Sequence, residues 1–309
     1  MSYSFQRDSF INEIYKEAQK NKNIYFLSAD FGAPSLDIFR KKLPKQFIHT
    51  GISEQNTIDI AIGLSLKNKI VVNYAMAPFI LSRAWEQHKI SSVMKLPMIN
   101  LIPGIGYGYA NAGPTHYSNE DLGLANLIVN SNIYTISDSK SASFVAKNII
   151  KKKSLYFIRL DREKNHNIDY TFKNRDMKNG YRVIFNGKKL CIISHGFLLN
   201  KLWRIINNNK YFRENITLID LFRCKPISKS LSILLEEHFH TIVFDEQYEM
   251  FNLSTLLLSY VNKNNLNTRI VGNALNEIID FGNDGREALL ERNNLSDKKI
   301  IAKIEKFIW

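Results

Sequence analysis

Short apolar runs alternate with amphipathic stretches along the first half of the chain. The runs are rich in β-branched and aromatic residues and predict buried strands at 24–29, 70–74, 98–103, 133–137 and 155–160. The intervening segments show helical spacing, most clearly after Gly51, where Ile58, Ala61, Ile62 and Leu66 would share one buried helix face. Strands that alternate with helices are typical of parallel βα units, so the first half is predicted to be an α/β domain.

The chain changes character after the last of these strands. Between Asp161 and Gly180 the composition becomes polar and charged, and we place a linker at 166–180. A second alternating series follows, with predicted strands at 189–194, 216–221, 241–245 and 269–272 and helices around 198–206, 230–239 and 251–261. We therefore expect an α/β protein of two domains with mostly parallel sheets, the first at 1–165 and a smaller one at 181–309.

The composition is that of an ordinary globular protein. Hydrophobic residues make up 45% and charged residues 23% of the 309 residues, which is enough chain for two α/β domains with separate cores. No stretch approaches the roughly 18 apolar residues of a membrane span, and residues 1–10 lack the pattern of a signal peptide. These features predict a cytoplasmic protein that does not act at a membrane.

The formal net charge of +13 raises the question of nucleic-acid binding. The lysines are spread along the chain among many asparagines, without a basic helix or interleaved aromatic residues, so we expect no nucleic-acid partner. An acidic partner subunit or an anionic substrate fits the charge at least as well. Cys191 and Cys224 lack C-x-x-C or zinc-like spacing, which predicts two reduced thiols and no metal site.

The segment at 47–56 reads Phe-Ile-His-Thr-Gly-Ile-Ser-Glu-Gln-Asn. A strand runs into Gly51, which permits a tight turn, and Glu54 is then presented at a helix start, where a carboxylate alone would stabilise the helix dipole by a few tenths of a kcal/mol. The string resembles the strand–turn–helix of the pyrimidine-binding domain in the transketolase family. The resemblance implies that Glu54 hydrogen-bonds a ring nitrogen of thiamine diphosphate and activates this cofactor, with Ile52 beside it in the cofactor site.

The segment at 73–87 reads Asn-Tyr-Ala-Met-Ala-Pro-Phe-Ile-Leu-Ser-Arg-Ala-Trp-Glu-Gln. It resembles the family stretch in which two phenylalanines three residues apart line the aminopyrimidine of the cofactor. Phe79 matches the second of them and is assigned to stacking on the ring, and Met76 stands in place of the first. A plain core role is the alternative for all the large apolar residues here, and we keep it for Trp85.

The segment at 104–116 reads Gly-Ile-Gly-Tyr-Gly-Tyr-Ala-Asn-Ala-Gly-Pro-Thr-His, and its glycine spacing does not fit a dinucleotide loop. It resembles the transketolase loop that ends Gly-Glu-Asp-Gly-Pro-Thr-His. The resemblance implies that His116 lies in the substrate channel, contacts substrate and transfers protons as a catalytic residue. Gly104, Asn111 and Ala112 stand where the family has a phosphate-contacting His, a Glu and a substrate-contacting Asp, so the substrate side departs from the family pattern.

Two further stretches extend the resemblance over nearly the whole chain. Residues 156–162, Tyr-Phe-Ile-Arg-Leu-Asp-Arg, are similar to the family run Ile-Arg-Leu-x-Arg, which implies that Arg162 binds substrate phosphate; a surface ion pair is the alternative. The second half resembles the transketolase C-terminal domain, which is structural and helps to form the dimer in the family. His195 in that half is therefore given no catalytic role.

The resemblance also implies what the chain lacks. Full-length family members begin with another domain, whose Gly-Asp-Gly motif and a later Asn hold a divalent cation on the cofactor diphosphate. The nearest string here, Gly-Asn-Asp-Gly at 282–285, lies close to the C-terminus without a following strand, and we count the motif as absent. A separate N-terminal-type transketolase subunit that carries Gly-Asp-Gly and holds Mg²⁺ or Ca²⁺ is the implied partner, in an α2β2 assembly.

The function implied is that of one subunit of a thiamine-diphosphate-dependent transketolase-like transferase. It would move a ketol or acyl unit from a sugar or 2-oxo acid to an aldehyde or keto-sugar acceptor, and only with its partner. One alternative is a subunit like deoxyxylulose-phosphate synthase or the 2-oxo-acid dehydrogenase beta chain, acting on pyruvate. Another is a binding module that kept the fold without turnover.

Overall fold

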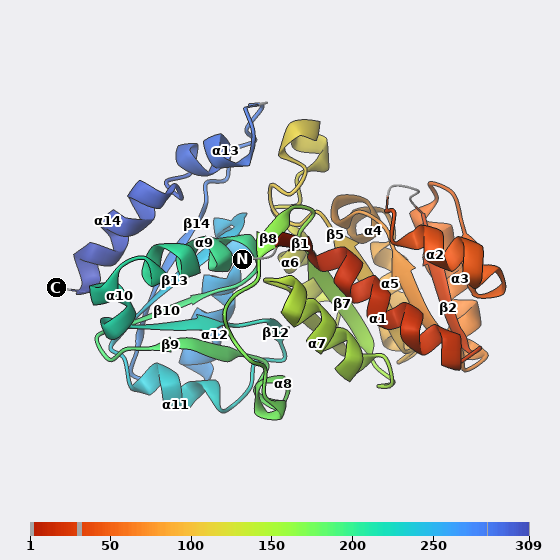
Figure 1. Cartoon of the computed structure of the whole chain (residues 1–309), viewed down its shortest axis with the longest axis horizontal. Helices are drawn as coiled ribbons and strands as arrows, with labels where there is room; N and C mark the ends of the chain where they lie inside the picture. Colours follow the sequence, from red (N-terminus) through yellow and green to blue (C-terminus); the bar gives the residue numbers. More distant parts are fainter. Residues whose placement is uncertain (1–2, 30–32, 283, 309) are drawn as a thin grey trace. The chain divides into compact units, whose positions relative to one another are not determined.

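The computed structural model describes residues 3–29, 33–282 and 284–308 (Figure 1). The chain forms two compact units, each with its own sheet. Unit 1 comprises the residues up to Ile105 together with Gly123–Asn167, and unit 2 comprises Gly106–Leu122 and Ile168 onward. Within the described residues, no helix is long and apolar enough to cross a membrane.

Unit 1 is built on a parallel sheet, as the alternating pattern predicts. Its strand order is β6-β7-β5-β4-β2-β3, and all the pairings between these neighbours are parallel. The strands are β2 (Ile24–Ser28), β3 (Phe47–His49), β4 (Ile70–Tyr74), β5 (Met98–Pro103), β6 (Ser131–Thr135) and β7 (Leu155–Leu160). Strands β5 and β7 are buried along their whole length, which is why they read as continuous apolar runs.

Helices fill the connections of unit 1. They are α1 (Gln6–Lys20), α2 (Leu36–Lys42), α3 (Glu54–Leu66), α4 (Ala77–Arg83), α5 (Trp85–Val93), α6 (Asp121–Leu127, whose first two residues belong to unit 2) and α7 (Ser139–Ile149). A short η1 (Pro44–Gln46) precedes β3, and β1 (Tyr3–Phe5) pairs antiparallel with β8 (Lys164–His166). Helices α1 and α7 lie side by side in Figure 1. Helix α7 starts at a capping box, in which Asp138 accepts from the Ser141 N–H and the Ser141 hydroxyl accepts from the Asp138 N–H.

The buried face of α3 differs in part from the predicted one. Ile58 and Ala61 are fully buried as expected, but Ile62 is only half-buried and Leu66 is 53% exposed. The buried stripe runs instead through Glu54, Thr57, Ile58, Ala61 and Ser65. Three helical turns of 3.6 residues bring Ser65, not Leu66, back beneath Glu54. The predicted spacing of eight residues from Ile58 to Leu66 therefore placed Leu66 on the buried face by mistake.

Unit 2 is a second, mostly parallel α/β layer, as predicted. Its sheet order is β14-β13-β10-β11-β9, with only the edge strand β9 antiparallel. The strands of this sheet are β9 (Arg182–Asn186), β10 (Leu190–Ser194), β11 (Ile216–Asp220), β13 (His240–Tyr248) and β14 (Arg269–Leu275), and the short β12 (Arg223–Lys225) of unit 2 is not part of it. The helices are α8 (Asn174–Asn179), α9 (Gly196–Asn207), α10 (Lys210–Asn215), α11 (Leu231–Glu236), α12 (Leu253–Lys263), α13 (Arg286–Arg292) and α14 (Asp297–Ile308), with short η2 (Ala110–Ala112), η3 (Pro114–His116) and η4 (Glu249–Phe251).

The division into units departs from the expected one in two places. The segment Gly106–Leu122, which falls inside the predicted first domain at 1–165, groups with unit 2. The stretch at 166–180 is not a plain linker, because it holds helix α8 and belongs to unit 2 from Ile168 onward. Unit 1 is therefore discontinuous in sequence, and its last segment ends at Asn167.

Candidate functional site

The turn between β3 and α3 presents a carboxylate at the start of a helix. Gly51 has φ +73°, in the left-handed region that favours glycine. The turn is held by the Ser53 hydroxyl, which donates to the Thr50 carbonyl at 2.8 Å, and by a hydroxyl contact of 2.6 Å between Thr50 and Thr57. Helix α3 then begins at Glu54, which confirms the predicted position of this residue.

The Glu54 carboxylate is buried and paired. Its side chain is 5% exposed, and Nη1 of Arg83 lies 3.0 Å from each carboxylate oxygen. The same guanidinium lies over the ring of Phe79, with Cζ 4.4 Å from the ring centroid. Arg83 thus offsets the charge of Glu54 and links it to the aromatic residue, a role that motif matching did not assign to it.

A cavity of about 600 Å³ opens at this end of α3. It is lined by Ile52, Ser53, Glu54, Gln55, Asn56, Asp59, Arg83 and Gln87. Ile52 is 83% exposed, an unusual state for an isoleucine beside a buried carboxylate. The volume is within the range of small-molecule sites, so unit 1 brings Ile52 and Glu54 together in a space that admits part of a cofactor.

Two other predicted cofactor residues belong to helix α4 of the same unit. Met76 is the residue before the helix and Phe79 lies in its first turn; both are half-buried. Neither of them lines the cavity, but Arg83, which does, lies over the Phe79 ring. Trp85 is also half-buried, and its indole Nε1 donates to the Leu124 carbonyl at 3.3 Å. That bond ties Trp85 to the interior of unit 1, in line with a structural role.

The predicted catalytic histidine, His116, belongs to unit 2. It lies on a loop closed by two backbone hydrogen bonds of 2.9 Å between Gly106 and Ser118. The imidazole is half-buried, and its Nδ1 is 3.0 Å from the hydroxyl oxygen of Thr115. His116 lies two residues before Ser118, and we call the paired residues Gly106 and Ser118 the neck of the loop.

Strand β13 anchors the neck of this loop. The Gln247 side-chain amide donates to the Ser118 carbonyl at 2.9 Å and accepts from the Leu122 N–H at 3.1 Å. The Glu246 carboxylate occupies the space in which a Cβ on Gly106 would lie, 2.6 Å from Oε2. Arg286 holds that carboxylate through Nε at 2.8 Å. Sequence reasoning missed these anchors, since Ser118 and Gln247 are far apart in the chain and carry no motif.

The predicted substrate residues are placed as follows. Arg162 is exposed just after β7 in unit 1. Gly104 follows β5 with φ +87°, and its N–H donates to the Leu160 carbonyl at 2.8 Å. Asn111 and Ala112 are exposed on η2 of unit 2.

Unit 2 also holds a buried Cys–His–Asp cluster. The thiol of Cys224 is 3.2 Å from Nδ1 of His195, and Nε2 of His195 is 3.0 Å from Oδ1 of Asp245. Burial lowers the pKa of His195, but the charges of Cys224 and Asp245 outweigh it and raise the pKa to about 10. Because all three side chains are buried, we regard the cluster as structural. Both cysteines are free thiols, and in the described part of the chain no group of three or more His, Cys, Asp or Glu could hold a metal ion.

Comparisons with known proteins place the chain among the transketolases. Residues 6–166 match the family described as "Transketolase, pyrimidine binding domain". A Methanocaldococcus jannaschii protein named as a transketolase C-terminal section is 22% identical over 311 residues, which cover 98% of this chain and 96% of that protein. One of the subunits of apulose-4-phosphate transketolase from Phocaeicola vulgatus is 24% identical over 277 residues, 86% of each chain.

The fold is likewise that of a transketolase. A solved structure described as "Split gene transketolase, inactive beta4 tetramer" superimposes with a TM-score of 0.85 at 22% identity, over 99% of both chains. This likeness confirms the two-domain, mostly parallel α/β architecture expected from the sequence. Because the matching family spans more than half of the chain, this protein belongs to the family of the transketolase pyrimidine-binding domain.

Proposed function

We propose that the chain is one subunit of a two-subunit transketolase-like transferase that uses thiamine diphosphate. The observation that carries the proposal is the Glu54 carboxylate, buried at the start of α3 and facing a cavity of about 600 Å³. Burying a carboxylate costs free energy unless a donor or a cation pairs with it, and in this chain Arg83 pairs with Glu54. A ring nitrogen of the cofactor would compete with Arg83 for this carboxylate.

The residues present fit the aminopyrimidine half of the cofactor. A flat, polar-edged ring needs a carboxylate at its edge and apolar side chains over its faces. Glu54 supplies the first, and Ile52, Met76 and Phe79 supply the second. The high exposure of Ile52 is explained if a bound ring covers it. When bound, thiamine diphosphate supplies the centre that stabilises a carbanion.

The remaining chemistry falls to side chains of this chain. Glu54 holds a proton at the ring nitrogen and so sets the charge on the ring. His116 moves a proton to and from a substrate oxygen, a task suited to an imidazole whose two nitrogens can exchange roles near neutral pH. Arg162 binds an anionic group of the substrate through its exposed guanidinium.

The diphosphate half of the cofactor needs another chain. A diphosphate requires a cation and further donors to offset its charge. The described residues contain no cluster able to hold a cation, so we place Mg²⁺ or Ca²⁺ on an N-terminal-type subunit with a Gly-Asp-Gly motif. The Phocaeicola relative is named as one subunit of a transketolase, which supports a divided enzyme. An α2β2 assembly in the cytoplasm, where free thiols persist, is the form that we propose.

An apolar surface on unit 2 supports the need for a partner. It surrounds a cavity of about 700 Å³. Five large apolar side chains that line it are more than half exposed: Met250, Phe251, Ile278, Ile279 and Phe281. A contiguous apolar surface of this kind is typical of an interface buried in an assembly.

The substrates are a sugar or a 2-oxo acid, from which a ketol or acyl unit passes to an aldehyde or keto-sugar. The replacements at Gly104, Asn111 and Ala112 favour a second candidate as well, a subunit acting on pyruvate in the manner of deoxyxylulose-phosphate synthase. Both candidates share the same roles for Glu54 and His116.

Substitution of Glu54 tests the proposed function. In the enzyme reconstituted with its partner, Glu54→Gln should lower kcat by roughly 100-fold or more, because the amide cannot hold the ring proton. Asp37→Asn, which changes an exposed carboxylate on α2 outside the cavity, is the control and should stay near wild type. Near-normal turnover of Glu54→Gln with an unchanged circular dichroism spectrum would refute the central assignment.

A further inference from the structure

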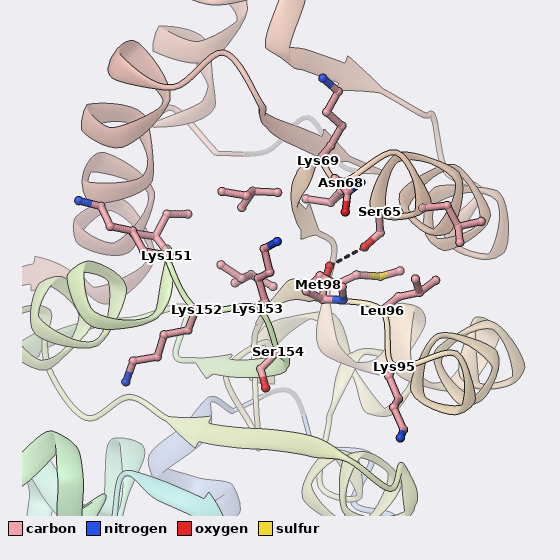
Figure 2. A pocket seen from close by; sticks show the side chains of 16 residues that line it. Ser65, Asn68, Lys69, Lys95, Leu96, Met98, Lys151, Lys152, Lys153 and Ser154 are labelled. Atoms are coloured by element: carbon pink, nitrogen blue, oxygen red, sulfur yellow. Dashed lines mark hydrogen bonds between the residues drawn. The ribbon is translucent and has the colours of Figure 1, made fainter.

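A second cavity of unit 1 lies at the opposite end of the sheet from Glu54. Its volume is about 320 Å³, and it lies between the connections α3–β4, α5–β5 and α7–β7 (Figure 2). In a parallel sheet these connections all reach the amino ends of the strands. Glu54 begins α3, whereas Ser65 and Leu66 at the end of α3 line this cavity, about 18 Å further along the helix. The cavity is therefore separate from the proposed cofactor site.

The lining of this cavity is strongly basic. It includes five lysines and no Asp or Glu: Lys69, Lys95, Lys151, Lys152 and Lys153. Three helix ends at this edge each contribute about half a negative charge, and Glu17 pairs with Lys151 at 3.4 Å. These opposing charges leave a net excess of about two to three positive charges. The cavity thus favours an anion even after the helix ends are neutralised.

The floor of the cavity is apolar. Val71, Met98, Ile99 and Ile150 line it from the buried sheet and from the end of α7. Leu66, which the sequence pattern assigns to the buried face of α3, is instead more than half exposed among the lining residues. The floor residues are already at most 3% exposed, so a ligand would gain chiefly by removing the Leu66 side chain from water.

One lysine is aimed differently from the others. Figure 2 shows Lys153 extending across the middle of the cavity, while Lys69, Lys95, Lys151 and Lys152 point outward around its rim. Among the described residues, the ammonium group of Lys153 makes no hydrogen bond or ion pair. Lys95 has φ +55°, in the left-handed region that glycine adopts without steric cost. Lys95 follows the C-cap of α5, so glycine could replace it without backbone strain.

We propose that this cavity binds a small phosphorylated molecule with a flat apolar body. The phosphate lies on Lys153, with rim lysines adding their charge, and the body covers Leu66 above the apolar floor. A phosphate is favoured over a single carboxylate because its two charges match the net excess at the site. The competing explanation is that the lysines only offset the three helix ends, and it predicts no ligand.

Calorimetric titration of the purified full chain at low salt tests the site. The probes are 1-naphthyl phosphate, inorganic phosphate and 1-naphthol, which separate the charged and the apolar halves of the proposed ligand. We expect 1-naphthyl phosphate to bind at one site per chain, at least ten-fold more tightly than either half. Lys153→Gln should weaken it at least ten-fold, and Lys95→Gly should weaken it less, without loss of thermal stability.

Lys147→Gln is the matched control, because Lys147 is an exposed lysine on α7, the helix just before Lys153, and does not line the cavity. It should bind 1-naphthyl phosphate like the wild type. The proposal is overturned if no saturable binding occurs. It is also overturned if Lys147→Gln weakens binding as much as Lys153→Gln, or if inorganic phosphate binds as tightly as 1-naphthyl phosphate.

Discussion

Arginine–carboxylate pairs occur in both units, in very different surroundings. Arg83, beside Glu54, is 49% exposed at its side chain, whereas Arg182 and Asp220 are fully buried and joined at 2.8 Å. Arg182 also lies over the ring of Phe172, with Cζ 4.4 Å from the centroid. Water screens the first pair and not the second, so their contributions to stability should differ greatly.

Alanine substitutions at these two arginines should separate the effects. Arg182→Ala should lower the free energy of unfolding by roughly 3–5 kcal/mol, because it leaves Asp220 charged and buried without its partner. Arg83→Ala should lower it by less, because the cavity of about 600 Å³ lets water reach the Glu54 carboxylate once Arg83 is gone. Urea denaturation at neutral pH measures both. Equal losses from the two variants would contradict the burial difference.

His88 gives the fold a specific weakness in acid. Burial lowers the pKa of this imidazole to about 3, and its ring packs edge-on against Phe157 at 5.0 Å between centroids. In the unfolded chain the group has its ordinary pKa near 6.5, so below that pH only the unfolded state takes up the proton. The stability that the neutral His88 side chain contributes is therefore fully present above pH 6.5 and is lost as the pH falls toward 3.

The contribution of His88 can be isolated by substitution. Between pH 7.5 and pH 5, this group alone should lower the free energy of unfolding by about 2 kcal/mol. His88→Leu should lose that part of the pH dependence, while other titrating groups act alike in both proteins. Urea denaturation at the two pH values gives the comparison. Identical pH dependence in variant and wild type would show that His88 is not the source.

At the scale of elements, the loop from Gly106 to Ser118 is the segment most dependent on distant residues. Gly106→Ala should loosen it, because the new methyl group would lie 2.6 Å from Glu246 Oε2 at a φ of +57°. Amide hydrogen exchange at 107–118 should quicken, while unit 1 stays unchanged. Gly113→Ala, with φ +82° but no atom within 4 Å, is the control for backbone strain alone. Equal loosening by both variants would rule out Glu246 as the anchor.

Helix α3 contains a glycine whose replacement by alanine should stabilise the protein. Gly63 lies on its exposed face, and no atom lies within 4 Å of the place that a Cβ would take. Gly63→Ala should raise the free energy of unfolding by roughly 0.5–1 kcal/mol, because alanine loses less backbone freedom on entering a helix. Thermal or urea denaturation would show it. A loss of stability would mean that the space above Gly63 is filled in the folded protein.

The elements that the sequence predicts well are those with strong local signals. Strands β4, β5 and β7 have the predicted bounds, since a buried parallel strand is a continuous apolar run. The start of α3 was also predicted, because Gly51 permits a tight turn and an acidic residue such as Glu54 is favoured at a helix start. Leu66 was misplaced because the helical stripe is set by packing against the sheet, which the spacing of apolar residues only approximates.

The candidate site was predictable only in part. The motif strings gave Glu54 and Phe79 as candidates. They did not indicate Arg83, which pairs with the Glu54 carboxylate and lies over the Phe79 ring. The bonds from Ser118 to Gln247 join segments with no shared pattern, so nothing in the sequence signals that the His116 loop groups with unit 2. Contacts of this kind depend on tertiary packing, whereas motifs record local backbone and chemistry.

At the scale of the whole molecule, the proposed function gives the chain one side of a cofactor site. The pyrimidine side has its carboxylate and apolar residues in unit 1, and the proposed substrate histidine is held by unit 2. The diphosphate side has no cation-binding cluster among the described residues. We therefore propose that the protein is one subunit of a divided enzyme and binds the cofactor fully only with its partner.

Calorimetric titration of thiamine diphosphate in the presence of Mg²⁺ tests this claim most directly. We expect weak binding to the chain alone and at least 100-fold tighter, stoichiometric binding when the subunit carrying Gly-Asp-Gly is added. Glu54→Gln in the mixture should weaken the tight binding, which would show that this chain contributes to it. Tight, stoichiometric binding by the chain alone would contradict the divided-enzyme proposal.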